Sequence, residues 1–221
     1  MFWFILTAIV GAAIIYLKFF VAAPSTGSPP PTSPVKKEGS SVAKKADVKI
    51  IFGSQTGTAE LFAKTLFRQG TKLGVTCQLV DIEDYHHTTL EVETMVIFVV
   101  ATYGEGEPTD TMKSFHDWLM DTYDDLSNVK YAVFGLGDRQ YKQFCQMGIE
   151  FDQRMDELGA QRVYGLGQGD SGRDIEEEFD GWSKDLWPCV GNKLGINLKA
   201  DVEEPFAPEL KLKVWDQEQA P

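Results

Sequence analysis

Cysteine and histidine are scarce in this sequence, with three of each among 221 residues. Cys77, Cys145 and Cys189 are odd in number and have no paired spacing, which argues against a disulfide framework and fits a reduced, cytosolic compartment. His86 and His87 are adjacent and have no second cluster at metal-ligand spacing. We therefore predict no metal site and interpret these histidines as surface polar residues.

Basic residues are outnumbered, with 21 Lys and Arg against 33 Asp and Glu. Residues 1–46 hold five Lys and one Glu, which leaves 16 basic and 32 acidic residues for the rest of the chain. So acidic a remainder excludes nucleic acid as a partner, because phosphate backbones require a basic surface. It fits either plain solubility or a basic protein partner.

No basic residue precedes the long apolar run at residues 2–23. About twenty apolar residues span a bilayer core. A cleaved signal peptide ending at Val21-Ala22-Ala23 is the alternative, but such peptides begin with a basic region that is missing here. The positive charges all follow the run or close it, at Lys18, Lys36, Lys37, Lys44 and Lys45. We therefore expect residues 1–23 to form a single transmembrane anchor whose C-terminal side is cytosolic.

Residues 24–46 have almost nothing to bury, because they consist largely of Pro, Ser, Gly and Lys. This composition is typical of a flexible tether. Its lysines either lie against anionic lipid headgroups or are simply solvated, and both interpretations stay open. At the other end, residues 198–221 are polar and interrupted by proline.

The intervening residues 47–197 have no internal repeat and alternate between β and α patterns. Apolar or β-branched runs predict strands at residues 48–52, 75–80, 95–101, 129–135 and 162–166. Helical spacing predicts helices from Ala59, from Pro108, around residues 147–158 and around residues 175–186, with Pro188 kinking or ending the last. The run at 95–101 is apolar throughout, as in strands buried on both faces. We expect a doubly wound α/β domain with five parallel strands.

The turn at residues 53–58, between the first strand and the first helix, carries three hydroxyls and two glycines. Backbone N–H groups and the positive end of a helix dipole converge in such a turn, which favours phosphate. It has no Lys, so it is not a nucleotide-triphosphatase loop, and it is not the GxGxxG of dinucleotide sites. The alternative is that a Ser or Thr side chain merely caps the helix.

The third and fourth strands each run into a loop that pairs a tyrosine with glycines. Tyr103 lies beside Gly104 and Gly106, and Tyr141 follows Gly137. The carboxyl ends of parallel strands meet at one edge of the sheet, where ligands bind. A flat ring between two tyrosines, opposite a phosphate turn, predicts flavin mononucleotide (FMN) as the cofactor.

Five motifs occur in order within residues 47–196: SQTGTAE, ATYGEGEPTD, FGLGDRQYKQF, DQRMDELGAQRVYGLGQGD and EEEFDGW. They resemble the FMN-binding domain of the diflavin reductases, which has the flavodoxin-like fold. Within that family, the anchor and tether fit the NADPH–cytochrome P-450 reductases. The resemblance implies that residues 198–221 begin a connection to an FAD- and NADPH-binding reductase domain.

The resemblance also implies which residues bind the cofactor. The FMN phosphate is assigned to Ser54, Gln55, Thr56, Gly57, Thr58 and Ala59. One wall of the ring site is assigned to Ala101, Thr102, Tyr103 and Gly104, with the Gly104 carbonyl near the flavin N5. The other wall is assigned to Leu136, Gly137, Asp138, Arg139, Gln140, Tyr141, Lys142, Gln143, Phe144 and Cys145. No residue is assigned as a general acid, base or nucleophile.

The sequence departs from the family at four positions near the predicted site. Asp138 and Cys145 stand where the family usually has Asn. An added carboxylate at Asp138 disfavours electron density on a nearby flavin, so we expect lower reduction potentials. The family's run of three Asp is here Asp170-Ser171-Gly172, which leaves the flavin contact expected at Ser171 open.

By this resemblance the chain is the FMN portion of an NADPH–haemoprotein reductase that does not oxidise NADPH alone. FAD takes a hydride from NADPH, and FMN passes the electrons singly to haem iron. The implied partners are membrane-bound haem proteins with basic faces, and the implied location is the endoplasmic reticulum membrane, with the domain cytosolic. An acidic docking cluster is predicted at Asp170, Glu176, Glu177 and Glu178, where a solvated helix face is the alternative.

Two other functions stay open on the sequence. One is a standalone, membrane-tethered flavodoxin-like electron shuttle. The other is a non-enzymatic anchored adaptor with a vestigial flavin fold, which would purify without colour.

Overall fold

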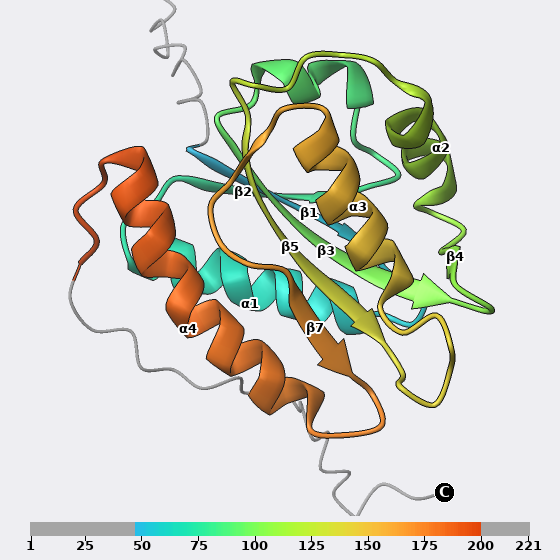
Figure 1. Cartoon of the computed structure of the whole chain (residues 1–221). Coiled ribbons are helices and arrows are strands. Elements are labelled where there is room, and N and C mark those ends of the chain that lie inside the picture. The colour runs from blue at the N-terminus through green and yellow to red at the C-terminus, as the bar shows by residue number, and fades with distance from the viewer. Residues whose placement is uncertain (1–46, 200–221) are drawn as a thin grey trace, which may run out of the picture. The chain divides into compact units, whose positions relative to one another are not determined.

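The computed structural model of the chain describes residues 47–199. In this part the elements follow in the order β1 (Val48–Gly53), α1 (Thr58–Lys72), β2 (Cys77–Asp81), the 3-10 helix η1 (His87–Val92), β3 (Met95–Tyr103), β4 (Glu107–Pro108), α2 (Lys113–Asp121), β5 (Lys130–Gly137), α3 (Gln146–Glu157), β6 (Gln161–Arg162), β7 (Gly167–Asp170) and α4 (Ile175–Leu194). Helices lie on both sides of one sheet (Figure 1).

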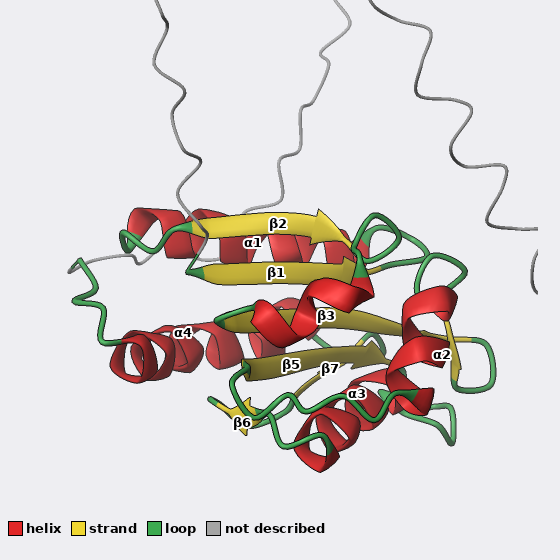
Figure 2. Ribbon diagram, turned by 90° about the horizontal axis from the view of Figure 1, so that it is seen from above, coloured by secondary structure: helices red, strands yellow, loops and turns green. Residues whose placement is uncertain are grey.

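The strands of the sheet lie in the order β2-β1-β3-β5, and β6 and β7 both pair with the far edge of β5. These pairs are parallel, so the labelled strands β1, β2, β3 and β5 end at the same edge (Figure 2). The short strand β4 pairs antiparallel with the end of β3. The predicted parallel α/β sheet is confirmed, although in the described residues it has seven strands rather than five. Strands β6 and β7 share one edge, and β4 is an added antiparallel strand.

Two apolar cores lie on the two faces of this sheet. One joins α1 and α4 to the sheet, and the other joins α2 and α3 to it. The side chains of β3 alternate between them: Met95, Ile97 and Val99 belong to the first core, and Val96, Phe98 and Val100 to the second. This alternation follows from the two-residue period of a strand, and it explains why the run is apolar throughout.

The predicted starts of two elements are wrong by a few residues. The second helix begins at Lys113 rather than at Pro108, because Glu107 and Pro108 form β4 and a turn closed by a Met112 N–H bond to the Thr109 carbonyl follows. Strand β2 begins at Cys77 rather than at residue 75, since the Val75 N–H bonds back to Gly70 in α1.

The predicted fifth strand at residues 162–166 is wrong in its placement, since β6 ends at Arg162 and β7 begins at Gly167. A Cβ on Gly167 would lie 2.4 Å from the Phe134 ring, so only glycine fits there. Of the two alternatives for Pro188, ending the last helix is wrong, because α4 continues to Leu194. Pro188 lies on the exposed side, where water can bond the carbonyl that proline leaves free.

The described chain enters and leaves the domain at one turn. The Asp47 N–H donates to the Thr76 carbonyl at 2.8 Å, and the Lys199 N–H donates to the Leu73 carbonyl at 3.0 Å. The turn at residues 73–76 connects α1 to the start of β2, and therefore lies at the amino ends of the parallel strands.

Within residues 47–199, no helix combines the length and the apolar character needed to cross a membrane. The predicted anchor (1–23), the tether (24–46) and nearly all of the connecting segment (198–221) lie outside the described residues. They stay predictions.

Candidate functional site: a pocket between two tyrosines

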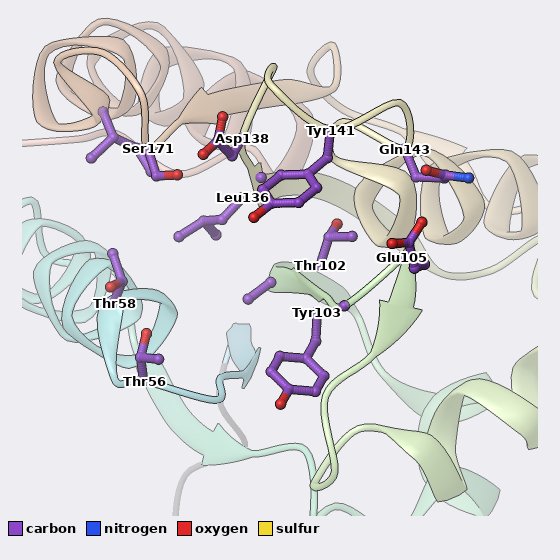
Figure 3. A pocket seen from close by; sticks show the side chains of 14 residues that line it. Thr56, Thr58, Thr102, Tyr103, Glu105, Leu136, Asp138, Tyr141, Gln143 and Ser171 are labelled. Atoms are coloured by element: carbon purple, nitrogen blue, oxygen red, sulfur yellow. The ribbon is translucent and has the colours of Figure 1, made fainter.

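A pocket of about 390 Å³ opens where β1, β3, β5 and β7 end. Predicted cofactor residues that line it are Thr56, Thr58, Ala101, Thr102, Tyr103, Gly104, Leu136, Gly137, Asp138, Tyr141 and Gln143. Glu105, Ser171 and Ile175 line it as well (Figure 3). The carboxyl edge of the sheet thus brings three separated loops together, as the strand pattern predicts.

The two tyrosines are the most conspicuous feature of this pocket. Their side chains lie on different sides of it, above and below the gap in Figure 3. Tyr103 is 49% exposed and Tyr141 is 59% exposed, although large aromatic side chains normally bury most of their surface. Two exposed rings bordering one pocket form a site for a flat, apolar ligand.

The phosphate turn (residues 53–58) begins helix α1 without a side-chain cap. The N-cap residue is Gly57, at φ 95°, and no side chain bonds to the helix N-terminus. Ser54 Oγ instead accepts a 2.9 Å bond from Gly57 N–H, inside the turn. Among the described residues the N–H groups of Thr58, Ala59 and Glu60 have no hydrogen-bond partner. The capping alternative is therefore wrong, and this helix end has donors for an anion.

Gln55 and Ala59, which the resemblance assigns to the phosphate, do not line the pocket with their side chains. Ala59 is fully buried in the core under α1. The Gln55 amide bonds to Asp110, with Nε2 donating to the carboxylate at 3.0 Å and Oε1 accepting from the backbone N–H at 3.1 Å. Gln55 thus reaches towards the segment before α2.

The hairpin wall (residues 103–107) carries Tyr103. Its ends are paired in the β3–β4 ladder, and the Gly106 N–H donates to the Tyr103 carbonyl at 3.1 Å. Gly104 (φ 54°) and Gly106 (φ 109°) take conformations that disfavour side chains. A Cβ on Gly106 would lie 2.7 Å from Gln143, so this glycine lets two loops pack together rather than giving a ligand access to the backbone.

The loop wall (residues 138–145) carries Tyr141. Asp138 begins it with a tight turn, in which its carboxylate accepts from the Gln140 N–H at 2.8 Å and its carbonyl accepts from the Tyr141 N–H at 3.0 Å. The Arg139 guanidinium lies 4.1 Å from the centre of the Phe144 ring. Of the residues predicted in this wall, Arg139, Gln140, Lys142, Phe144 and Cys145 do not line the pocket.

Cys145 closes the loop wall from inside the protein. It is fully buried, at φ 51°, and its thiol donates to the carbonyls of Gly135 (3.3 Å) and Gly169 (3.6 Å). A Cβ on Gly137 would lie 2.5 Å from its backbone nitrogen. Burial raises the pKa of the Cys145 thiol to about 12, so the thiol stays neutral. Its place is behind the pocket, where it supports Gly137.

Asp170 does not belong to a surface docking cluster, because it is only 2% exposed. Its carboxylate accepts from the N–H groups of Arg139 (3.2 Å) and Gly172 (3.0 Å) and lies near the Arg139 and Arg173 guanidinium groups. Its own N–H donates to Glu178 Oε2 at 2.6 Å. The prediction of Asp170 as a docking residue is therefore wrong. Glu178 is partly buried, and its carboxylate is already bonded to the Asp170 N–H. Glu176 and Glu177 remain exposed.

Comparison with known proteins gives this arrangement a family. The flavodoxin family matches residues 50–182, more than half of the chain. The chain belongs to the flavodoxin family. The solved flavodoxin of Streptococcus pneumoniae TIGR4 superposes with a TM-score of 0.59 at 26% identity, over 66% of this chain and 98% of that one.

Higher identity is found with reductases. The chain is 40% identical over 178 residues to the NADPH–cytochrome P450 reductase of Dictyostelium discoideum, covering 79% of this chain and 27% of that protein. It is 43% identical over 180 residues to the reductase of the same name from Oryctolagus cuniculus, covering 77% and 26%. The chain spans about a quarter of the length of these relatives.

The residues of this flavodoxin domain fit FMN. The order of its strand positions is that of flavodoxin-like sheets, which bind FMN beside the strand at which the order reverses. In this domain that place lies between β1 and β3, and the loops after both strands line the pocket. The uncapped end of α1 suits the phosphate, and the exposed faces of Tyr103 and Tyr141 suit the ring. FMN is thus the cofactor of this domain.

Proposed function

We propose that this domain carries electrons, one at a time, from an FAD- and NADPH-binding reductase module to haem proteins of the cytochrome P450 type. The identity of 40–43% with NADPH–cytochrome P450 reductases supports this proposal. Identity with the solved flavodoxin is 26%, so a standalone electron shuttle is the less favoured alternative. The adaptor alternative is not favoured either, because the ring walls and the phosphate turn are intact.

The exposure of Tyr103 and Tyr141 carries the proposal. FMN, when bound, supplies the one-electron chemistry. The chain's own residues orient the ring between the tyrosines, hold the phosphate at the end of α1 and leave the pocket open at the carboxyl edge of the sheet. An electron carrier needs such an open edge, since a partner has to approach the ring closely. None of the pocket residues is required as a general acid or base in this function.

The exposed carboxylates of Glu176 and Glu177, in the first turn of α4, are the proposed contact for a basic face of the haem protein. They follow Ser171 and Ile175, which line the pocket, so a partner bound there would lie next to the flavin. Complementary charge of this kind mainly speeds association. Residues 1–23 are proposed to hold the domain at the endoplasmic reticulum membrane, on its cytosolic side.

The test uses the full chain loaded with FMN and reduced with dithionite in the absence of oxygen. Mixing with ferric cytochrome P450 should give reduced haem in a stopped-flow absorbance trace. Adding NADPH to the FMN-loaded chain alone should leave the flavin oxidised, and adding a separately produced FAD/NADPH module should restore reduction. A reduced chain that leaves the haem ferric would refute the proposal, as would NADPH oxidation by the chain alone.

A further inference from the structure

Gln55 is assigned to the phosphate by sequence, yet its side chain is engaged elsewhere. It forms two hydrogen bonds with one residue, Asp110, through both ends of its amide. The two residues are 55 positions apart, so the pair links the phosphate turn to the segment that follows β4. We call this pair the Gln55–Asp110 clasp. Both of its residues are exposed, and neither lines the pocket.

The Asp110 side of the clasp is fixed by the core. Its neighbour Thr109 and nearby Met112 are fully buried, and the Met112 N–H closes the turn on the Thr109 carbonyl at 3.0 Å. Met112 also packs on Gly53, where a Cβ would lie 2.8 Å from its sulfur. Asp110 therefore stands at a fixed place beside the end of β1, whether or not Gln55 bonds to it.

The Gln55 side of the clasp has less support. Within the turn, Ser54 Oγ holds the Gly57 N–H from the inside, and Gln55 is tied from the outside. Thr56 and Thr58, on either side of Gly57, face the pocket in Figure 3. A turn held at both points keeps its N–H groups directed at one position, which pre-organises it for a phosphate group.

We propose that Gln55 and Asp110 are positioning residues that set the affinity of the domain for the FMN phosphate without touching it. The inference depends on FMN binding and not on the electron acceptor. The hairpin wall has its own support in the β3–β4 ladder and the Gly106–Tyr103 bond. Loss of the clasp should therefore disturb the phosphate turn and leave the ring walls in place.

The experiment compares FMN with riboflavin, which lacks the phosphate, by flavin-fluorescence titration of the full-length apoprotein. Gln55→Ala should weaken FMN binding about tenfold, because a turn released from Asp110 has to be ordered again when FMN binds. Riboflavin affinity should change less than about twofold. Asp110→Asn keeps an acceptor oxygen and the backbone N–H, so it should bind FMN at least as well as the unchanged chain.

A double-mutant cycle and a control separate the clasp from other effects. Asp110→Ala leaves the Asp110 N–H in place and removes a negative charge that repels phosphate, so its loss should be smaller than that of Gln55→Ala. The loss of FMN affinity in the Gln55→Ala/Asp110→Ala double variant should be clearly smaller than the sum of the two single losses. Gln78→Ala, at an exposed position on β2, should change neither affinity. Thermal unfolding of each apoprotein reports whether it is folded.

Three results would overturn the inference: unchanged FMN affinity in folded Gln55→Ala, a parallel fall in riboflavin affinity, or additive effects in the cycle. If Gln55→Ala does not fold, the two Asp110 variants test the inference by themselves. Asp110→Ala removes the oxygen that accepts from Gln55 and should weaken FMN binding, whereas Asp110→Asn keeps such an oxygen and should not. The haem-reduction test with the unchanged chain is independent of these outcomes, so the electron-transfer proposal stands or falls separately.

Discussion

Tyr103 and Tyr141 border the same pocket from two loops that are held in place by different kinds of contact. The hairpin wall is fixed by backbone hydrogen bonds, through the β3–β4 ladder and the turn that Gly106 closes. The loop wall has no such ladder. Besides the backbone turn bond from the Tyr141 N–H to the Asp138 carbonyl, its shape depends on side chains: the carboxylates of Asp138 and Asp170 and the thiol of Cys145.

Because of this difference, different substitutions are expected to disturb the shape of each wall. A backbone ladder survives most side-chain changes, provided that the glycines at positive φ are kept. A wall held by polar side chains, of which Asp170 and Cys145 are buried, loses hydrogen bonds to the backbone when one of these side chains is removed. We therefore expect substitutions behind the loop wall to be felt at the pocket, and comparable ones in the hairpin wall to be tolerated.

The largest effect is expected from Tyr141→Asp, which removes the ring of the loop wall and places a carboxylate against the flavin. Aromatic stacking contributes roughly 0.5–1.5 kcal/mol beyond burial, and loss of burial and charge repulsion add to this. FMN affinity should fall by at least about 100-fold. Tyr103→Phe keeps the ring of the hairpin wall and loses only a hydroxyl, so FMN should stay bound.

Flavin titration of both variants measures this difference, and far-UV circular dichroism confirms that each is folded. Tyr141 is largely exposed, so the apo domain should fold without it. Unchanged FMN affinity in folded Tyr141→Asp would place the ring somewhere else.

The next effect is expected from Asp170→Ala, which tests the support of the loop wall. The buried carboxylate accepts from two backbone N–H groups, and bonds to a charged group are worth about 1.5–3 kcal/mol each. Apo stability should fall by about 3 kcal/mol, and FMN affinity should fall with it. Glu107→Ala, an exposed acid in the hairpin wall, is the matched control and should change stability by less than about 0.5 kcal/mol.

Urea unfolding and flavin titration measure both variants. Equal losses in the two would contradict the contrast between the walls, as would a stable Asp170→Ala domain with full affinity.

A smaller effect, visible at alkaline pH, is expected from Cys145→Ala. Burial raises the pKa of the Cys145 thiol from 9.0 to about 12, so the unfolded thiol loses its proton first as the pH rises. The contribution of this thiol to stability is complete below pH 9 and declines as the pH rises towards 12. The unchanged domain should therefore lose more stability between pH 8 and pH 11 than Cys145→Ala does.

Chemical unfolding at the two pH values gives this comparison. Cys77, whose pKa burial also raises to about 12, is present in both proteins and cancels in the difference. Parallel losses in the two proteins would show that Cys145 contributes nothing to the pH dependence.

The smallest effect is expected from neutralising Glu176 and Glu177 together to Gln, because neither side chain supports a wall. FMN affinity should not change. Electron delivery to a basic haem protein should slow by a few-fold at low salt and by less at high salt, since salt screens exposed charges. Stopped-flow rates across a salt series measure this, and an unchanged salt slope would reduce the pair to solvated surface.

Much of the fold and the centre of the site could be predicted from the sequence. The apolar run at residues 95–101 indicates a strand buried on both faces, and Tyr103 and Tyr141 follow from the rule that parallel strands end at one edge. These features depend on local pattern, which a single sequence contains. Backbone ladders such as β3–β4 were not predicted, because two residues give too short a pattern.

The remaining features depend on partners distant in the chain. Nothing near Gln55 indicates that it bonds to Asp110, and nothing near Asp170 distinguishes a buried carboxylate from a surface one. Gly167 and Gly169 favour a turn by propensity, yet both lie in strand β7. Glycine is required at these two positions because the ring of Phe134 occupies the space that a Cβ would need. Only tertiary packing decides such positions.

The turn at residues 73–76 accepts hydrogen bonds from both Asp47 and Lys199, at the amino ends of the strands. The pocket opens at the carboxyl ends, across the full length of the sheet. Polypeptide that continues from Asp47 or Lys199 is therefore joined to the domain behind the surface that carries Tyr103 and Tyr141. The surface that carries Tyr103 and Tyr141 is thus left uncovered by the residues at which the described part of the chain begins and ends.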